Sequence, residues 1–215
     1  MGTFRFQVAV SLDGYVAGPD QSEEKPLGVG GLDLHRWVFE LEAWRNQHGQ
    51  DGGEVNASTR VVEEAQSNVR ATMMGRNMFG GGPGPWSDDP PWNGWWGENP
   101  PFHTPVFVLT HHEREPLEKQ GGTTFTFVTD GIESALEQAR AAAGGKEVSV
   151  AGGAEAIQQY LKAGLLDQIQ IHLVPILLGD GRRLFDDLDT GQTQLESTRV
   201  IESPGVTHLR FRVVK

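Results

Sequence analysis

The chain has 215 residues, contains no cysteine and carries a formal net charge of −11 at pH 7. This length predicts a single domain, residues 1–215, with a sizeable core. The acidic balance and the lack of a Lys/Arg cluster argue against nucleic-acid binding. The lack of cysteine excludes disulfides and thiolate metal sites, and no apolar run is long enough to predict a membrane span.

The first predicted element is a strand in which Phe4, Phe6, Val8 and Val10 alternate with other residues. The N-terminal stretch MGTFRFQVAV lacks the charged-then-apolar order of a secretion signal, so we expect a cytoplasmic protein. A glycine-containing loop, Ser11–Pro19, follows the strand. Asp13 in this loop is a candidate to orient or protonate a substrate, and the alternative is a turn residue that bonds nearby backbone.

Residues 21–53 are predicted to be an insertion with glycine-rich polar ends around a short amphipathic helix. It packs on the domain surface or over a cleft, or forms an interface. Its apolar residues at helical spacing are Leu34, Trp37, Val38, Leu41 and Trp44.

The next predicted helix is Ala57–Asn68, capped by Asn56 or Ser58. A short strand, Ala71–Met74, leads into a turn at Gly75–Phe79. Residues 80–105 then form a long loop rich in Trp, Pro and Gly. Loops of this length without regular structure tend to be functional, and its tryptophans favour burial over disorder.

Two further strands, Val106–Leu109 and Phe125–Val128, precede a helix at Ile132–Ala143. Glu147–Gly164 then reads as strand, glycine turn and helix. Such a turn exposes backbone N–H groups at the positive end of a helix dipole, which binds phosphate. The alternative is an ordinary tight turn between a strand and a helix.

The last predicted elements are a strand from Ile169 to Leu178 and a hairpin of Leu195–Ile201 with Val206–Val214. Strand–helix alternation followed by a hairpin predicts an α/β fold. Its sheet is mostly parallel, with helices on both faces and antiparallel strands at one edge. Neither a G-x-G-x-x-G fingerprint nor a Walker A motif is present.

Five stretches, in order, resemble the dihydrofolate reductase superfamily, closest to the reductase domain of riboflavin biosynthesis, the RibD C-terminal domain-like branch. They are SLDGYVAG, MMGRNMF, VFVLTH, VAGGAEAIQQYL and IHLVPILLGDGRRLF. The resemblance implies a dihydrofolate reductase-like, three-layer αβα fold and an NADPH cofactor. It covers most of the chain except residues 21–53 and part of 80–105.

The resemblance also implies roles for individual residues. Arg76 would pair with the 2′-phosphate or the pyrophosphate of NADPH. From the residues alone, Arg76 could instead form an ion pair on the protein surface. His111 and His112 could equally be solvent-facing, and they do not suit a metal pair, because adjacent strand residues point to opposite faces. The full set implied for the cofactor is Val16 and Ala17 beside the nicotinamide; Gly75, Arg76 and Asn77 at the phosphates; Leu109, Thr110 and His111 at the adenosine; and Ala151, Gly152, Gly153, Ala154 and Glu155 at the pyrophosphate and nicotinamide ribose.

One departure concerns the acidic residue that folate reductases carry on the helix before the M-G-R strand. The corresponding region, Asn56–Thr59, has no carboxylate, and Asp33 could substitute only if the insertion folded into the site. The leading function is therefore an NADPH-dependent reductase of a small heterocyclic or carbonyl substrate, resembling 5-amino-6-(5-phosphoribosylamino)uracil reductase. A non-catalytic nucleotide-binding or interaction protein is the alternative, and dihydrofolate reductase is less favoured.

Tryptophans are the candidate walls of the substrate site, because indole rings stack on flat heterocycles and exclude water. The candidates are Trp37, Trp86 and Trp92. The alternative is that these rings only fill the core beneath a long loop. The resemblance further implies a homodimer that uses the strand from Ile169 and the C-terminal hairpin.

Overall fold

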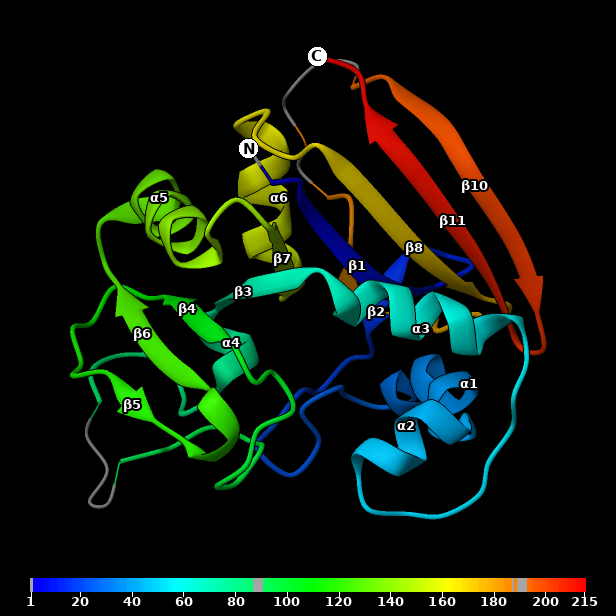
Figure 1. Ribbon diagram of the computed structural model, residues 1–215, viewed down its shortest axis with the longest axis horizontal. Helices are drawn as coiled ribbons and strands as arrows, with labels where there is room; N and C mark the ends of the chain where they lie inside the picture. The colour runs from blue at the N-terminus through cyan, green and yellow to red at the C-terminus, as the bar shows by residue number, and fades with distance from the viewer. Residues whose placement is uncertain (1, 87–90, 187, 189–192) are drawn as a thin grey trace.

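The computed structural model describes residues 2–86, 91–186, 188 and 193–215. Within these residues the chain forms a nine-stranded sheet in the order β10-β11-β8-β1-β7-β3-β4-β6-β5. Figure 1 shows the helices lying on both sides of this sheet and the C-terminal hairpin at one end of it. The predicted α/β, three-layer architecture is confirmed.

The centre of the sheet is parallel. Its strands are β1 (Phe4–Ser11), β3 (Val69–Gly75), β4 (Pro105–Leu109), β6 (Thr124–Val128), β7 (Glu147–Gly152) and β8 (Gln168–Val174). The hairpin of β10 (Leu195–Ser203) and β11 (Val206–Val213) joins antiparallel to β8, as predicted. At the other edge, β5 (Leu117–Glu118) is a second antiparallel strand that no pattern had indicated.

One face of the sheet is covered by α5 (Gly131–Ala143) and α6 (Ala154–Lys162). Alternation along β1 sends Phe4 and Phe6 into this layer, where both are fully buried with Tyr160 of α6. Each such burial stabilises the fold by about 1.5–3 kcal/mol. This layer is the main core of the described structure.

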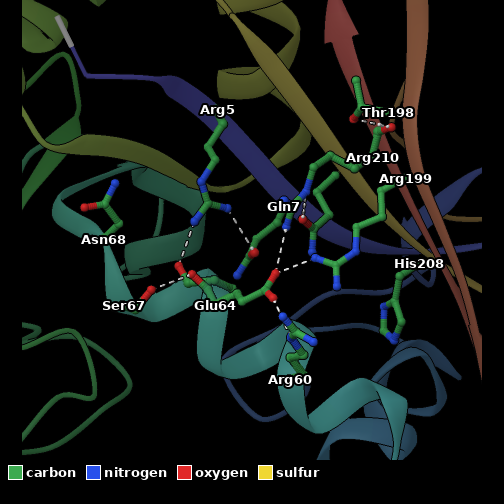
Figure 2. Close-up of polar contacts among 12 residues, drawn as sticks. Arg5, Gln7, Arg60, Glu64, Ser67, Asn68, Thr198, Arg199, His208 and Arg210 are labelled. Carbon is green, nitrogen blue, oxygen red and sulfur yellow. Dashed lines mark hydrogen bonds and ion pairs between the residues drawn. The ribbon is translucent and has the colours of Figure 1, made fainter.

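The opposite face is largely polar where α3 (Ala57–Ser67) covers it. Arg5 of β1 is buried there and donates to the Ala65 carbonyl oxygen and to Glu147. Figure 2 shows Glu64 of α3 directed at arginines from its own helix and from the hairpin, with Arg199 as an ion-pair partner. A helix over this part of the sheet therefore needs ion pairs as well as apolar contacts.

The cap of α3 is a capping box. The Asn56 side chain accepts from the Ser58 backbone N–H at 2.9 Å, and the Thr59 hydroxyl accepts from the Asn56 backbone N–H at 3.1 Å. The prediction of Asn56 as a cap is confirmed, and two N–H groups at the helix start are satisfied.

The insertion folds on the α3 side of the sheet as short pieces rather than one helix. They are a 3-10 turn, η1 (Gly31–His35), and two helices, α1 (Arg36–Phe39) and α2 (Glu42–Gln47). Leu34 and Leu41 are fully buried, so the insertion is part of the packed structure. The expectation of one helix through Trp44 was wrong because Leu41 leaves the helical conformation, with an extended backbone at the start of α2.

Two other predicted boundaries need correction. The strand from Ile169 ends at Val174 rather than Leu178, because Pro175 has no N–H for the ladder. Gly75–Phe79 is a one-turn helix, α4 (Arg76–Phe79), rather than a simple turn. In the part of the chain that the structure describes, no helix combines the length and the apolar character that crossing a membrane requires.

Candidate functional site

The carboxyl ends of the parallel strands bring together three of the segments implied to bind a cofactor. Gly75 pairs with Leu109 in the ladder between β3 and β4, and Met74 pairs with Gly152 between β3 and β7. The connection after β1, through α3 to β3, and the connection after β7, through α6 to β8, run in opposite directions along the sheet. Ligands of open α/β sheets bind where the direction of the connections reverses in this way, here between β1 and β7.

The start of α6 is open to a ligand. Gly153 is its N-cap and provides no side-chain cap. A β-carbon added at Gly153 would meet no atom within 4 Å, whereas one at Gly152, whose φ is +142°, would lie 3.2 Å from Met78 Sδ. The peptide bond between the two glycines is cis. The first N–H groups of α6 therefore face space that a side chain would fill.

The end of β3 lies next to this helix. A β-carbon added at Gly75 would lie 3.5 Å from the Ala156 Cβ and 3.7 Å from the Gly153 nitrogen, which are ordinary contact distances. The two glycine-containing segments are thus neighbours. Ala154 is buried in α6, Ala151 is half-buried at the end of β7, and Asn77 is exposed on α4.

The segment with Val16 and Ala17 is a short strand, β2 (Tyr15–Ala17), which the sequence had indicated only as a loop. It pairs with β9 (Arg182–Arg183) in a separate two-stranded sheet. The Arg182 guanidinium lies 3.4 Å from the Glu155 carboxylate in the first turn of α6. This ion pair links the β2–β9 sheet to the open helix start.

Arg76 is directed into the Trp-rich loop. Its Nε and Nη2 donate to the carbonyl oxygens of Gly80 and Gly81 at 3.1 and 2.9 Å. Its guanidinium carbon lies 3.0 Å from the centre of the Trp86 ring. Nη1 is buried, and no described residue accepts a hydrogen bond from it. Burial lowers the pKa of Arg76, and the charge of Arg114 lowers it further.

The segment after β4 joins the same group. Thr110 is buried and donates its backbone N–H to the Val128 carbonyl at 3.1 Å, whereas His111 is exposed. The Trp86 indole donates to the His112 carbonyl at 3.1 Å. Trp86 therefore connects the phosphate and adenosine segments that the resemblance had named separately.

Asp13 fastens its own loop to the segment after β8. Its carboxylate accepts from the Ser11 hydroxyl at 2.5 Å and from the backbone N–H groups of Gly179 and Leu178 at 2.7 and 3.1 Å. The bond from Ser11 and then those from the backbone hold the pKa of Asp13 at about 2. These contacts favour the turn role over that of a proton donor, because the group stays ionised near neutral pH.

The candidate tryptophans lie in two places. Trp37 packs with Leu34 and Val174 at the β8 side of the α3 face. Trp86 and Trp92 pack on the half formed by β3, β4 and β6, where the Trp92 indole donates to the Phe79 carbonyl at 2.8 Å. All three are half-buried, and they belong to two separate apolar clusters, so their rings do not form one wall.

A buried histidine pair lies beneath Trp37, and sequence reasoning missed it. His172 Nδ1 lies 2.7 Å from His208 Nδ1, and His208 Nε2 lies 2.9 Å from the Ser58 hydroxyl. The Trp37 ring centre is 5.0 and 5.1 Å from those of His172 and His208. Burial lowers the pKa of His172 to about 3 and that of His208 to about 4. The available signal was the alternation of side chains along β8 and β11. It places His172 and His208 on the sheet face opposite to that of Ile169 and Ile171.

The start of α3 lacks the carboxylate that folate reductases carry there, and Asp33 of the insertion does not take its place. Asp33 pairs with the exposed Arg36 at 2.6 Å on the surface of η1 and α1. At the start of α3, Asn56 and Ser58 are engaged in the cap and with His208. The site thus differs from a folate-type pocket at this position.

The residues present fit a phosphorylated dinucleotide. The uncapped start of α6 with its open Gly153 suits a pyrophosphate, and the buried, unpartnered Nη1 of Arg76 suits an anionic oxygen. The two lie at the ends of neighbouring strands.

Comparison with known proteins points to one family. The model of the RibD C-terminal domain family matches residues 3–209. The uncharacterized protein YwjB of Bacillus subtilis strain 168 is 31% identical over 199 residues, covering 87% of this chain and 84% of YwjB.

Solved structures show the same fold at lower identity. A protein from Shewanella sp. PV-4, provisionally assigned to riboflavin biosynthesis, has a TM-score of 0.62 and 22% identity, with 99% of both chains covered. Dihydrofolate reductase from Enterococcus faecalis, solved in complex with NADP(H) and RAB-propyl, has a TM-score of 0.51 and 11% identity, with 100% of this chain and 98% of that chain covered.

Proposed function

The chain belongs to the RibD C-terminal domain family, and from this we propose that it is an NADPH-dependent reductase of a small heterocyclic or carbonyl substrate. The proposed reaction resembles the reduction of 5-amino-6-(5-phosphoribosylamino)uracil in riboflavin biosynthesis. The observation that carries the proposal is the open start of α6 at Gly153, next to the end of β3 that bears Arg76. NADP(H) in the Enterococcus faecalis enzyme of this fold supports the choice of cofactor.

In this proposal the cofactor supplies the hydride, and the chain supplies binding, orientation and the exclusion of water. The N–H groups at the start of α6 hold the pyrophosphate, and Arg76 holds a phosphate oxygen. Ala151 and the β2 segment with Val16 and Ala17 flank the nicotinamide. The exposed Arg182–Glu155 ion pair lies between the β2–β9 sheet and the helix start.

The substrate would enter on the α3 face, between Trp37 and the pair Trp86 and Trp92. The half-buried Trp37 ring offers an aromatic surface for a flat heterocycle, and the buried histidine pair lies beneath it. Asp13 orients this region through the backbone it holds. Its low pKa means that the proton accompanying the hydride comes from another group or from water.

A non-catalytic nucleotide-binding or interaction protein is the second candidate. The observation that favours it is the packing of the insertion, with Leu34 fully buried and Trp37 seated on His172 and His208. With Trp37 packed on the histidine pair, the protein could bind a nucleotide and still leave no room for a substrate on the α3 face.

Titration of tryptophan fluorescence with NADPH and NADH tests the proposal first, because it requires no substrate. We expect saturable binding of both, tighter for NADPH. Oxidation of NADPH with phosphorylated and unphosphorylated pyrimidine substrates then separates the two candidates. Binding without turnover of any of them supports a non-catalytic nucleotide-binding protein. No binding of either nucleotide refutes the reductase and favours the interaction protein.

A further inference from the structure

A groove lies at the amino ends of β1 and β8, the end of the sheet opposite to the candidate site. Its volume is about 650 Å³, which is within the range of small-molecule binding sites. The main core holds Ile169 and Phe211, so alternation directs their neighbours Gln168, Arg210 and Arg212 to the α3 face, where they line the groove. Among the described residues, none of α3 lines the groove, so this part of the face is open.

Three guanidiniums beside the groove share one carboxylate. Glu64 of α3 pairs with Arg60 at 2.9 Å and with Arg199 of β10, and its Oε2 lies 3.8 Å from Nη2 of Arg210 on β11. Figure 2 shows Glu64 between the helix arginine and the hairpin arginines. The remaining basic residues of the groove each pair with a carboxylate of their own. Three positive charges against one negative charge leave an excess of two, in a chain whose net charge is −11.

Arg210 is the least compensated of the three. Its distance of 3.8 Å to Glu64 is too long for a hydrogen bond, and its Nε donates to a neutral acceptor, Gln170 Oε1, at 2.9 Å. Burial lowers the pKa of Arg210, and the charges of Arg199 and Arg5 lower it further, against the opposite effect of nearby carboxylates. An anion in the groove would therefore find a guanidinium whose charge is only partly balanced.

Gln170 is a buried amide with one unused donor. The bond from Arg210 fixes the orientation of the amide, and Nε2 is then left without an acceptor among the described residues. Such a buried donor calls for a partner that the protein itself does not supply.

A small hollow beside Gln170 adjoins the groove. It has a volume of about 10 Å³, enough for about one atom of the size of a water oxygen. Arg199 and Arg210 line the hollow and the groove alike. The hollow is also lined by His208, whose two ring nitrogens are already engaged with other side chains. An anionic oxygen in the hollow would accept from Gln170 Nε2 and from a guanidinium, with the rest of its molecule in the groove.

We infer that Arg199, Arg210 and Gln170 form a binding site for a small aliphatic polyanion, either a polycarboxylate or a sugar phosphate. Both kinds of molecule present several charged oxygens to guanidinium and amide donors. No aromatic side chain lines the groove among the described residues, so a nucleobase has no ring to stack on there. The site is independent of the proposed function, because it lies at the other end of the strands.

Three variants, each of which lowers the net charge by one, test the site. Gln170→Glu puts an oxygen of the protein next to the hollow in place of the unused donor. Thr198→Asp adds a carboxylate at an exposed position of β10 that lines the groove, so it leaves the core untouched. Arg36→Gln is the matched control, at an exposed arginine of α1 that pairs with Asp33. Thermal melting verifies that each variant is folded.

Calorimetric titration at constant ionic strength uses two probes, citrate and fructose 1,6-bisphosphate. We expect the wild type to bind at least one of them saturably. Gln170→Glu and Thr198→Asp should weaken that binding about tenfold or more, because each opposes or replaces a charge-assisted hydrogen bond, and Arg36→Gln should bind like the wild type. Tighter binding of citrate assigns the site to polycarboxylates, and tighter binding of the bisphosphate assigns it to sugar phosphates.

Failure of both probes to bind to the wild type at millimolar concentration would overturn the inference. Equal affinities of Thr198→Asp and Arg36→Gln for the bound probe would also overturn it, whether or not Gln170→Glu folds. Titration with NADPH keeps the two proposals apart. A wild-type protein that binds a polyanion in this groove and no nucleotide refutes the proposed cofactor while the groove site stands.

Discussion

His172 and His208 point their Nδ1 atoms at each other across 2.7 Å, so one ring donates and the other accepts. This contact requires that the two rings are not both protonated. The charged groups around them are Arg5, Arg199, Arg210 and His35, all of which oppose further positive charge. The pair is therefore a neutral unit in the folded protein.

We predict that the free energy of unfolding falls as pH falls from about 6.5 towards 4, because the unfolded chain takes up protons that the buried pair refuses. The loss is at most about 1.4 kcal/mol per pH unit for each histidine. Urea unfolding at several pH values in the upper part of this window measures it. Carboxylates with lowered pKa, such as Asp13, add their own loss only at lower pH.

The variant His172→Gln with His208→Gln should show a flatter dependence on pH, and the exposed His111→Gln should keep the wild-type slope. If the double variant kept the wild-type dependence of unfolding free energy on pH, the histidine pair would not be the cause of that dependence.

Gly153→Val should abolish NADPH binding and leave the fold intact. The backbone at Gly153, φ −73° and ψ −172°, suits any residue, and the added atoms meet open space rather than protein. They would occupy the space in front of the α6 N–H groups. Fluorescence titration and thermal melting measure the two effects. Binding that survives in a folded variant would make this turn purely structural.

Asp13→Asn should lower turnover without moving the pH profile in the neutral range, because the wild-type carboxylate is already ionised there. The expected cause is a loosened loop, since an amide offers one acceptor oxygen where the carboxylate offers two. Ser11→Ala is the control, as it removes one hydrogen bond to Asp13 and keeps the charge. A shift of the acid limb in Asp13→Asn alone would restore Asp13 as a proton donor.

We propose a two-fold symmetric dimer of about 47 kDa, twice the chain mass of 23.5 kDa, with the β10–β11 hairpin in its interface. Val200 on β10 is 62% exposed, and a carboxylate there should weaken a buried contact. Light scattering at micromolar concentration should find Val200→Asp shifted to monomer. Val55→Asp, at a residue 70% exposed next to α3, should remain dimeric. A wild-type monomer would disprove the proposal.

Much of the fold followed from periodicity, because Phe4 and Phe6 or Val148 and Val150 must alternate wherever one face of a strand is buried. What the pattern missed depends on contacts between distant residues. The pairing of Tyr15 with Arg183 is one example, and the ladder there is too short to leave a trace in the sequence. Pro175 was visible, and its effect on the strand from Ile169 was underestimated.

The candidate site divides in the same way. Gly152, Gly153 and Arg76 were found because short motifs carried them. The histidine pair was not, because a buried imidazole is defined by what surrounds it, and those neighbours come from other elements. Tryptophan content predicted burial but could not predict that Trp37 lies apart from Trp86.

The position of β1 has a consequence for synthesis on the ribosome. This strand lies between β7 and β8, partners that begin at Glu147 and Gln168 and are made much later than β1. Until those strands are made, Phe4–Ser11 has two bare edges and no sheet to join. Pairings this distant in sequence form late and slowly. The apolar side chains of β1 therefore stay without their final partners until the strands at Glu147–Gly152 and Gln168–Val174 have been made, and exposed apolar side chains in an incomplete chain favour aggregation.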